Sequence, residues 1–309
     1  MRILSRVPNI DFMRLRVPAV GLSALLTVLA VLLIAFRGLS LGIDFTGGVL
    51  VEVSYPQSAP LEEVREALAR ADFEGASVQY FGTSQDVLIR LPPTADNDSA
   101  AISTAVLDAL GTMEPAPELR RVEFVGSAVG DELAVDGGLA ALFAIIGILI
   151  YVAFRFEWKF ALGAIVATVH DALFVLGWFA LLGIEFDLPT LAAVLAVIGY
   201  SLNDTIVIYD RIRENFLDLR KASPSEVINV SVNQTLARTI VTGGTTLFVL
   251  VALFYLAGSA VHNFAIALIV GVLVGTYSSI FVGSAMVLGL GVTREDLLPP
   301  AETEVDDMP

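Results

Sequence analysis

Residues 239–293 read TIVTGGTTLFVLVALFYLAGSAVHNFAIALIVGVLVGTYSSIFVGSAMVLGLGVT, a stretch that holds no Asp, Glu, Lys or Arg. A transmembrane helix needs about 20 predominantly apolar residues, because each residue adds only about 1.5 Å along the helix axis. The stretch is long enough for two such helices, and we expect them to be separated at residues 258–263, GSAVHN. The sequence therefore predicts a membrane protein.

Four segments upstream of this stretch meet the same requirement of length and apolarity. Together with the two helices above, the predicted spans are residues 17–36, 137–154, 160–184, 188–209, 239–257 and 264–290. The composition agrees, since 56% of the 309 residues are hydrophobic and only 17% are charged, whereas soluble domains carry roughly 25% charged residues. We predict a polytopic α-helical membrane protein with six transmembrane helices, in which residues 1–36 form the N-terminus and first span.

The composition also excludes several classes of site. The chain has no cysteine, which rules out disulfides, thiolate metal ligands and cysteine nucleophiles. Its net charge of −15 argues against nucleic acid as a partner, because phosphate binding needs a basic surface. The glycine-rich segment GIDFTGG at 42–48 lacks the Gly-Lys-Ser/Thr ending of a phosphate-binding loop. We therefore expect neither a nucleotide nor another cofactor nor a metal.

The distribution of Lys and Arg predicts how the chain crosses the membrane. Arg2, Arg6, Arg14 and Arg16 precede the first span, and basic residues beside a span favour the cytoplasmic side. This span is longer than the apolar region of about 7–15 residues in a signal peptide, so we expect an uncleaved anchor. The loops after the second and fourth spans carry further Lys and Arg, whereas the turns after the third and fifth carry none. Both termini are therefore predicted to be cytoplasmic.

Residues 37–136, between the first two spans, are predicted to form a periplasmic domain. They carry 17 acidic and 6 basic residues, which is most of the negative charge of the chain. Apolar alternation and helical spacing predict, in order, a strand at 48–53, a helix at 61–70, strands at 77–81 and 87–91, a helix at 100–110 and a strand at 121–125. The order β-α-β-β-α-β is typical of a ferredoxin-like α+β fold.

Residues 137–293 are predicted to hold the other five spans, with a cytoplasmic amphipathic loop at 210–238. Within this loop, three apolar residues recur at helical spacing beside basic residues, a pattern typical of a helix that lies along the membrane surface: Ile212, Phe216 and Leu219. Residues 223–226, SPSE, combine a capping box with proline at the first helical position and predict the start of a short helix. Residues 294–309 are acidic, and we expect a disordered tail.

Three charged residues lie within or at the edge of predicted spans, where a charge costs roughly 2.5–3.5 kcal/mol on insertion scales. Asp171 is central in the third span, Asp204 lies in the inner half of the fourth, and Arg238 begins the fifth. The predicted topology places Asp204 and Arg238 at a similar depth, where they could pair. A poorly solvated Asp can bind and release a proton beside a guanidinium that stays charged. We predict a proton pathway with Asp204 as carrier and Arg238 as the fixed charge.

Other polar residues could extend or support this pathway. Asp171, together with His170, which titrates near neutrality, could extend the proton pathway, and Asn203, adjacent to Asp204, could support it. Structural interpretations stay open beside the functional ones. Asp204 could be a polar contact between helices, Arg238 an anchor that reaches to the membrane interface, and His170 a residue of helix packing.

Four motifs stand out along the chain: GYSLNDTIVIYDRIREN at 199–215, GIDFTGG at 42–48, VGSAVGDEL at 125–133 and NQTLARTI at 233–240. Together they resemble the SecF branch of the SecD/SecF family, which belongs to the resistance-nodulation-division (RND) superfamily. The resemblance covers nearly the whole chain and implies that Asp204 and Arg238 occupy the proton-pathway positions of the family. It also implies a Ser-Pro after Ile280, where this chain reads FVGSAM, so a proline kink in the sixth span is not expected.

The resemblance further implies a function and partners. It implies a subunit of the Sec pathway in the bacterial inner membrane that works with SecD, the SecYEG channel and YajC. Such a subunit uses the proton motive force to promote late steps of preprotein translocation, and it is not an enzyme. Three alternatives stay open: half of an RND-type exporter of lipid or small molecules, a passive scaffold, and an intramembrane aspartyl protease. The last is disfavoured because YSLND at 200–204 departs from the Gly-x-Gly-Asp pattern of such proteases.

Overall fold

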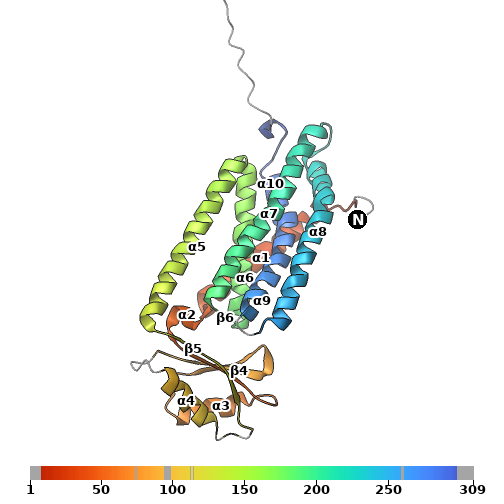
Figure 1. The fold of residues 1–309 in the computed structure, drawn as a ribbon. Coiled ribbons are helices and arrows are strands. Elements are labelled where there is room, and N and C mark those ends of the chain that lie inside the picture. Colours follow the sequence, from red (N-terminus) through yellow and green to blue (C-terminus); the bar gives the residue numbers. More distant parts are fainter. Residues whose placement is uncertain are drawn as a thin grey trace, which may run out of the picture.

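The molecule consists of a bundle of long helices with an α+β domain attached at one end (Figure 1). The computed structural model describes residues 8–73, 75–93, 99–111, 113, 115–258 and 261–297. Six of the described helices are long and apolar enough to cross a membrane. This confirms the number of spans that the sequence predicts.

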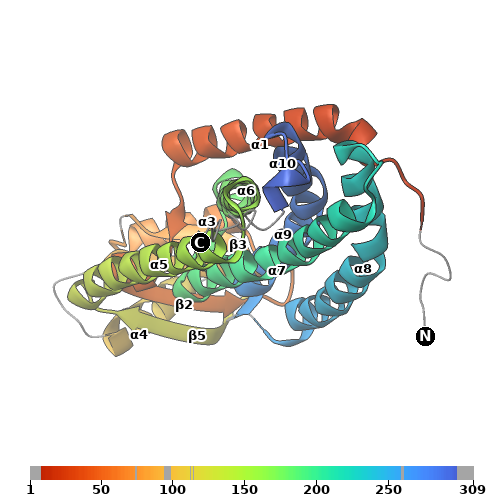
Figure 2. The same cartoon turned by 90° about the horizontal axis from the view of Figure 1, so that it is seen from above.

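The bundle is built from α1, α5, α6, α7, α8 and α9. Their bounds are α1 Arg16–Arg37, α5 Ser127–Arg155, α6 Trp158–Leu182, α7 Leu188–Asp218, α8 Pro224–Leu256 and α9 His262–Ser278. The 3-10 turn η1 Met13–Leu15 precedes α1. Helix α9 continues through the π-helical turn η3 Ser279–Gly283 into α10 Ser284–Gly289. Helices α6, α7 and α9 pack on one another at the centre, while α1 covers α6 and α8 covers α7 and α9 (Figure 2). The charge-free stretch thus forms two helices, as predicted.

The α+β domain has the predicted order of elements. It contains β2 Gly48–Ser54, α3 Leu61–Arg70, β3 Ser77–Phe81, β4 Thr83–Leu91, α4 Ser99–Leu110 and β5 Glu118–Val125. The strands form an antiparallel sheet in the order β3-β4-β2-β5. This order, with the two crossover helices, is that of a ferredoxin-like fold. Residue 87 was the predicted start of β4, but the strand begins at Thr83, because the turn is reduced to Gly82 at a φ of +70°.

The two faces of the sheet are buried against different parts of the molecule. Val51, Val53 and Ile89 belong to an apolar core that also contains residues of α3 and α4. Leu50 and Leu88, on the opposite face, form a second cluster with Ile43. Ile43 begins α2 Ile43–Thr46, a short helix that follows the first span. Helices α3 and α4 therefore cover one face of the sheet, and α2 covers part of the other.

Helix α5 begins ten residues before the predicted span at 137. The motif at 125–133 supplies the last residue of β5 and the first turns of this helix. Gly130 explains the close approach of α5 to the α+β domain, because a Cβ there would lie 2.6 Å from the backbone nitrogen of Gly47. The helix stands apart from the rest of the bundle over much of its length (Figure 1).

The end of the bundle remote from the α+β domain corrects the prediction for residues 210–238. Helix α7 continues without interruption to Asp218 and α8 begins at Pro224, so this described part of the chain forms a helical hairpin with no separate helix along a membrane surface. The capping box of Ser223 and Glu226 is present, but the helix that it starts is 33 residues long.

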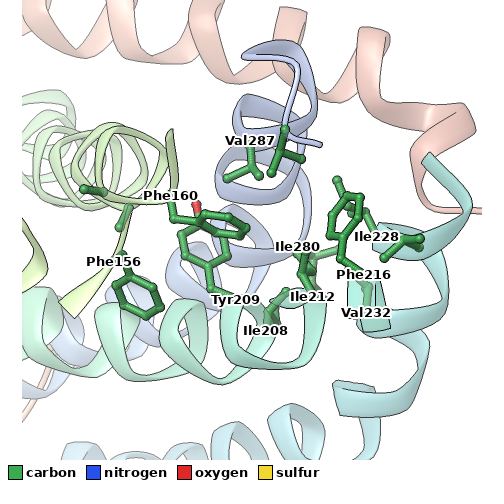
Figure 3. Packing of buried hydrophobic residues seen from close by; sticks show 14 of the residues in the cluster. Phe156, Phe160, Ile208, Tyr209, Ile212, Phe216, Ile228, Val232, Ile280 and Val287 are labelled. Carbon is green, nitrogen blue, oxygen red and sulfur yellow. The ribbon is translucent and has the colours of Figure 1, made fainter. Parts of the chain in front are cut away.

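Apolar packing explains why this hairpin forms. Ile212 and Phe216 are buried in a cluster (Figure 3) that also contains three residues of α8: Val227, Ile228 and Val232. The apolar spacing read as a membrane-facing stripe is therefore the interface between α7 and α8. Amphipathic spacing marks a buried face without specifying whether protein or lipid covers it.

Residues 294–297, the first four of the predicted disordered tail, are ordered. Residues Glu295–Leu297 form the 3-10 turn η4, and Leu297 packs against the cluster at the remote end of the bundle. Asp296 accepts a hydrogen bond of 2.7 Å from Lys159 Nζ and another of 2.7 Å from the Thr293 amide. The hydrogen bond from Lys159, together with the one from the Thr293 amide, holds the pKa of Asp296 below its ordinary value. Residues 298–309, where the rest of the predicted tail falls, lie outside the described residues.

Candidate functional site: buried carboxylates in the helix bundle

Asp171 is the most deeply buried charged residue of the bundle and has a complete set of partners. Its side chain is 0% exposed. Oδ2 accepts hydrogen bonds from the hydroxyls of Ser201 on α7 and Ser278 on α9, the latter at 2.7 Å. Oδ1 lies 2.9 Å from Nδ1 of His170. The carboxylate therefore joins the three central helices, and His170 is buried beside it.

Small residues on α9 bring its hydroxyls to this point. A Cβ at Gly271 would lie 2.1 Å from Cγ2 of Val197, and a Cβ at Gly275 would lie 2.9 Å from Cβ of Ser201. Helices in a membrane associate by such close packing at Gly-xxx-Gly spacing, because lipid supplies little hydrophobic driving force. The glycine pair thus sets α9 against α7, and Ser278 follows one turn later.

A π-helical turn follows Ser278 directly. It spans Ser279–Gly283, and the Ser284 hydroxyl donates a hydrogen bond of 2.9 Å to the Ser279 carbonyl. Interruptions of this kind in α-helices are frequent at functional sites. The sixth span is therefore interrupted next to the Asp171 cluster even though the chain lacks the proline that the family resemblance implies.

Asp204 lies one turn beyond Ser201 on α7 and has the opposite environment. The residue is 2% exposed, and its Oδ2 is buried without a hydrogen-bond partner among the described residues. Ser201 and Thr205, which flank it on the same helix, are also buried. An ionisable group in this state retains all of its capacity to bind a proton or accept a hydrogen bond.

Arg238 of α8 is the basic residue whose charge acts on Asp204. The sequence suggested that the two residues could pair, but among the described residues no ion pair or hydrogen bond joins them. Arg238 is exposed, as is Asn203. This chain therefore leaves Arg238 on α8 and Asn203 on α7 uncovered, whereas Asp204 is buried.

The predicted site residues thus divide into two groups. Asp204, Arg238 and Asn203 lie along α7 and α8, and Asp171 belongs to the separate cluster that touches this group through Ser201. Ser278 was missed, because a serine in an apolar helix ordinarily bonds its own backbone. The position of Ser278 three residues after Gly275, on a helix with a close-packing glycine pair, was the signal in the sequence that could have identified it. No group of three His, Cys, Asp or Glu suited to a metal occurs among the described residues.

Comparisons with known proteins agree with the motifs. The family profile "Protein export membrane protein SecD/SecF, C-terminal" matches residues 105–293, and the profile "SecD/SecF GG Motif" matches residues 32–59. The protein translocase subunit SecF of Vibrio alginolyticus is 46% identical over 100% of this chain and 99% of its own length. The corresponding subunit of Pseudomonas aeruginosa is 49% identical over 98% of this chain and 99% of its own.

A solved structure supports the same relationship. The crystal structure of SecDF, a translocon-associated membrane protein from Thermus thermophilus, matches with a TM-score of 0.82 and 38% identity over 93% of this chain and 39% of that one. This chain thus spans about two fifths of the solved SecDF chain. Because the first profile matches more than half of the sequence and SecF relatives match over their full length, the chain belongs to the SecD/SecF family of protein export membrane proteins.

Proposed function

We propose that this chain is a transport subunit of the Sec protein-export machinery that uses proton flow, with Asp204 as the proton carrier. The observation that carries the proposal is a buried carboxylate without a hydrogen-bond partner beside a basic residue at an open surface. A group that alternates between a neutral and a charged form changes the balance of forces on its helix at each step. One charge moved through 100 mV supplies about 2.3 kcal/mol, enough for a few protons to shift a domain between two positions.

Arg238 is proposed as the fixed charge of the pathway. Its guanidinium stays protonated at any accessible pH, so only the charge on Asp204 changes. When Asp204 is ionised, the two residues attract each other, and protonation removes that attraction. The position of Arg238 at the surface of α8 permits the required change in distance, because nothing in the described chain holds the guanidinium in an ion pair. Asn203, exposed on the same surface, is proposed as a supporting polar group.

Asp171 is proposed to position the carrier and not to carry protons itself. Its three hydrogen bonds favour a single arrangement, and they hold Ser201 one turn from Asp204. A buried carboxylate with these three partners is held in one orientation, because a change of position breaks several hydrogen bonds at once. The cluster therefore fixes the depth and rotation of α7 on which Asp204 depends.

A SecD-type chain is the proposed partner, seated on the open surface of α7 and α8. The solved SecDF chain is more than twice as long as the part that this chain matches, so the rest of that protein would be supplied here by a second subunit. The exposed Arg238 and Asn203 suit a polar contact with such a partner inside the membrane. SecYEG, YajC and the translocating preprotein are proposed as further contacts of the assembled complex.

The proposed orientation places both termini in the cytoplasm of a bacterial inner membrane. Arg14 and Arg16, at the start of the first span, and the basic residues beside the α5–α6 and α7–α8 connections lie at the same end of the bundle, the end that the positive-inside rule assigns to the cytoplasm. The α+β domain, at the opposite end, is then periplasmic. It stands on the side where exported chains emerge.

The decisive experiment replaces Asp204 by Asn in inverted vesicles that contain the full export complex. We expect D204N to lower export to the rate measured after the proton gradient is collapsed, because the side chain can no longer take up a proton. D218N, at the exposed end of the same helix, is the matched control and should leave export unchanged. Full proton-dependent export by D204N would exclude the carrier role and favour a passive scaffold.

A further inference from the structure

A short parallel strand pair joins the α+β domain to the turn between α6 and α7. Strand β1 Ser40–Leu41 pairs with β6 Glu185–Phe186. The pairing continues through the Gly42 amide, which donates a hydrogen bond of 2.8 Å to the Phe186 carbonyl. Gly42 has no room for a side chain, since a Cβ would lie 3.0 Å from Oε1 of Glu185. The backbone of residues 40–42 is therefore in direct contact with the turn between α6 and α7.

A buried ion pair strengthens this junction. Arg90, on the central strand β4, lies 2.9 Å from Oε1 of Glu185, and the two side chains are only 19% and 7% exposed. The Arg90 guanidinium also donates a hydrogen bond of 2.7 Å to the Leu41 carbonyl. The Glu185 carbonyl accepts a hydrogen bond of 3.0 Å from Asn263 at the start of α9. One pair of residues thus ties the sheet to β1, to the α6–α7 turn and to α9.

The first turn of α7 is fixed from both sides of the junction. Asp187 is its N-cap and accepts a hydrogen bond of 2.8 Å from the Thr190 amide. Asp44 of α2, which belongs to the α+β domain, accepts one of 2.8 Å from the Leu188 amide. Carboxylates at the start of a helix interact favourably with its unpaired amides and dipole. The N-terminus of α7 is therefore capped in part by Asp44, a residue of the α+β domain.

Apolar contacts close the junction. Ile43 is buried together with Leu50 and Leu88 of the sheet, and the ring of Phe81 on β3 lies 6.0 Å from the ring of His262 at the start of α9. Burial raises the pKa of Glu185 while Arg90 opposes that rise. The pair is thus a buried one that resists separation, because undocking would leave either charge without its partner.

We propose that the α+β domain and the α6–α7 turn move as one rigid unit through the Arg90–Glu185 junction, so that a displacement of α7 is delivered to the sheet. Helix α7 is unbroken from Leu188 to Asp204, a rise of about 24 Å at 1.5 Å per residue. A push at Asp204 therefore reaches the first turn of α7, three residues after Glu185, along a single stiff helix. The rigid unit stands by itself, whereas the delivery of proton-driven movement rests on the proposed function.

The test uses charge reversal in the full chain, assembled with its complex in membranes. R90E and E185R each place like charges together, and the double variant R90E/E185R restores an attractive pair. The first readout is hydrogen exchange of the Gly42 and Leu188 amides, which bond across the junction. We expect each single reversal to raise exchange at both amides by about tenfold or more, and the double variant to return most of the protection. R120E, at an exposed pair of the same domain, is the matched control.

The second readout is proton-dependent export with Asp204 intact. We expect R90E to lose it and R90E/E185R to regain it, while R120E keeps it. Unchanged exchange in both single reversals would overturn the rigid unit. Raised exchange with undiminished export would overturn the delivery of movement. The carrier role is separated from both by D204N: if that variant exports normally while R90E still raises exchange, the junction stands and the proton function fails.

Discussion

Replacing Gly271 by alanine tests whether close contact between α9 and α7 builds the buried site. The new Cβ would lie 2.1, 2.7 and 2.9 Å from three carbon atoms of Val197, a residue that is 1% exposed. Carbon atoms pack best at about 3.5–4.0 Å. The two helices must therefore separate by about 1.5 Å at this point, or the Val197 side chain must adopt a strained rotamer.

The expected cost follows from this overlap. Overpacking a well-packed interior by a methyl group costs about 1–3 kcal/mol, and the melting temperature falls by roughly 2–4 °C for each kcal/mol in a protein of some 150–250 residues. The separation also reaches Gly275, one turn further along α9, whose Cα faces Ser201. We therefore expect G271A to weaken the hydrogen bond between Ser201 and Asp171 and to lower proton-dependent export together with stability.

The assay is a double-mutant cycle on thermal unfolding of the purified complex in detergent. V197A alone removes two buried methyl groups and should destabilise the chain. In G271A/V197A the two closest overlaps, at 2.1 and 2.7 Å with the Val197 methyl carbons, disappear, and only the one at 2.9 Å with Cβ is left. The double variant should therefore be more stable than the sum of the two changes by about 1–3 kcal/mol. G244A, at a position with open space around it, is the control. A G271A variant as stable as the parent, or no coupling with V197A, would refute the reasoning.

Two further predictions concern the remote end of the bundle. G163A should destabilise the chain by about 1–3 kcal/mol, because its Cβ would lie 2.5 Å from the Tyr209 hydroxyl. In a double-mutant cycle on thermal unfolding, Y209F should relieve that cost. An equal loss of stability from G163A with and without the Tyr209 hydroxyl would contradict the prediction. The lowered pKa of Asp296 means that its bond to Lys159 stabilises the docked segment above pH 3.8 and is lost as the pH falls below that value. Hydrogen exchange of the Thr293 amide, divided by its intrinsic rate at the same pH, measures this docking. In the unchanged protein it should stay slow at pH 5, whereas in K159A it should be fast even at pH 7.

The fold was predictable wherever one physical signal dominates. Apolar length fixed the number of spans, and alternating residues such as those of β2 identified the strands of the α+β domain. The ends of the long helices were less predictable. Residues 127–136 and 210–218 are helical beyond the apolar cores, because contacts with other parts of the chain stabilise them. The two-residue pairing of β1 with β6 leaves no periodic signal at all.

The candidate site was predictable to the extent that charge in a membrane is costly. That cost singled out Asp171, Asp204 and Arg238 without any structural information. It could not say which carboxylate has partners, because the hydroxyls of Ser201 and Ser278 come from other helices and depend on how those helices pack. The free-energy cost of a charge in the membrane identifies these residues in the sequence, whereas only the packing of the helices shows which of them have hydrogen-bond partners.

The contrast between the two carboxylates is the strongest structural argument for a division of labour. Asp171 and Asp204 are both buried. Asp171 has hydrogen-bond partners on both of its oxygens, whereas Oδ2 of Asp204 has none among the described residues. A chain that needed only polar contacts between helices would satisfy both, because an unsatisfied buried polar group costs about 1–3 kcal/mol. That cost is retained at Asp204, one turn from a fully bonded cluster and beside an exposed arginine. Such an arrangement is expected where the group must exchange a proton and where a second chain completes its surroundings.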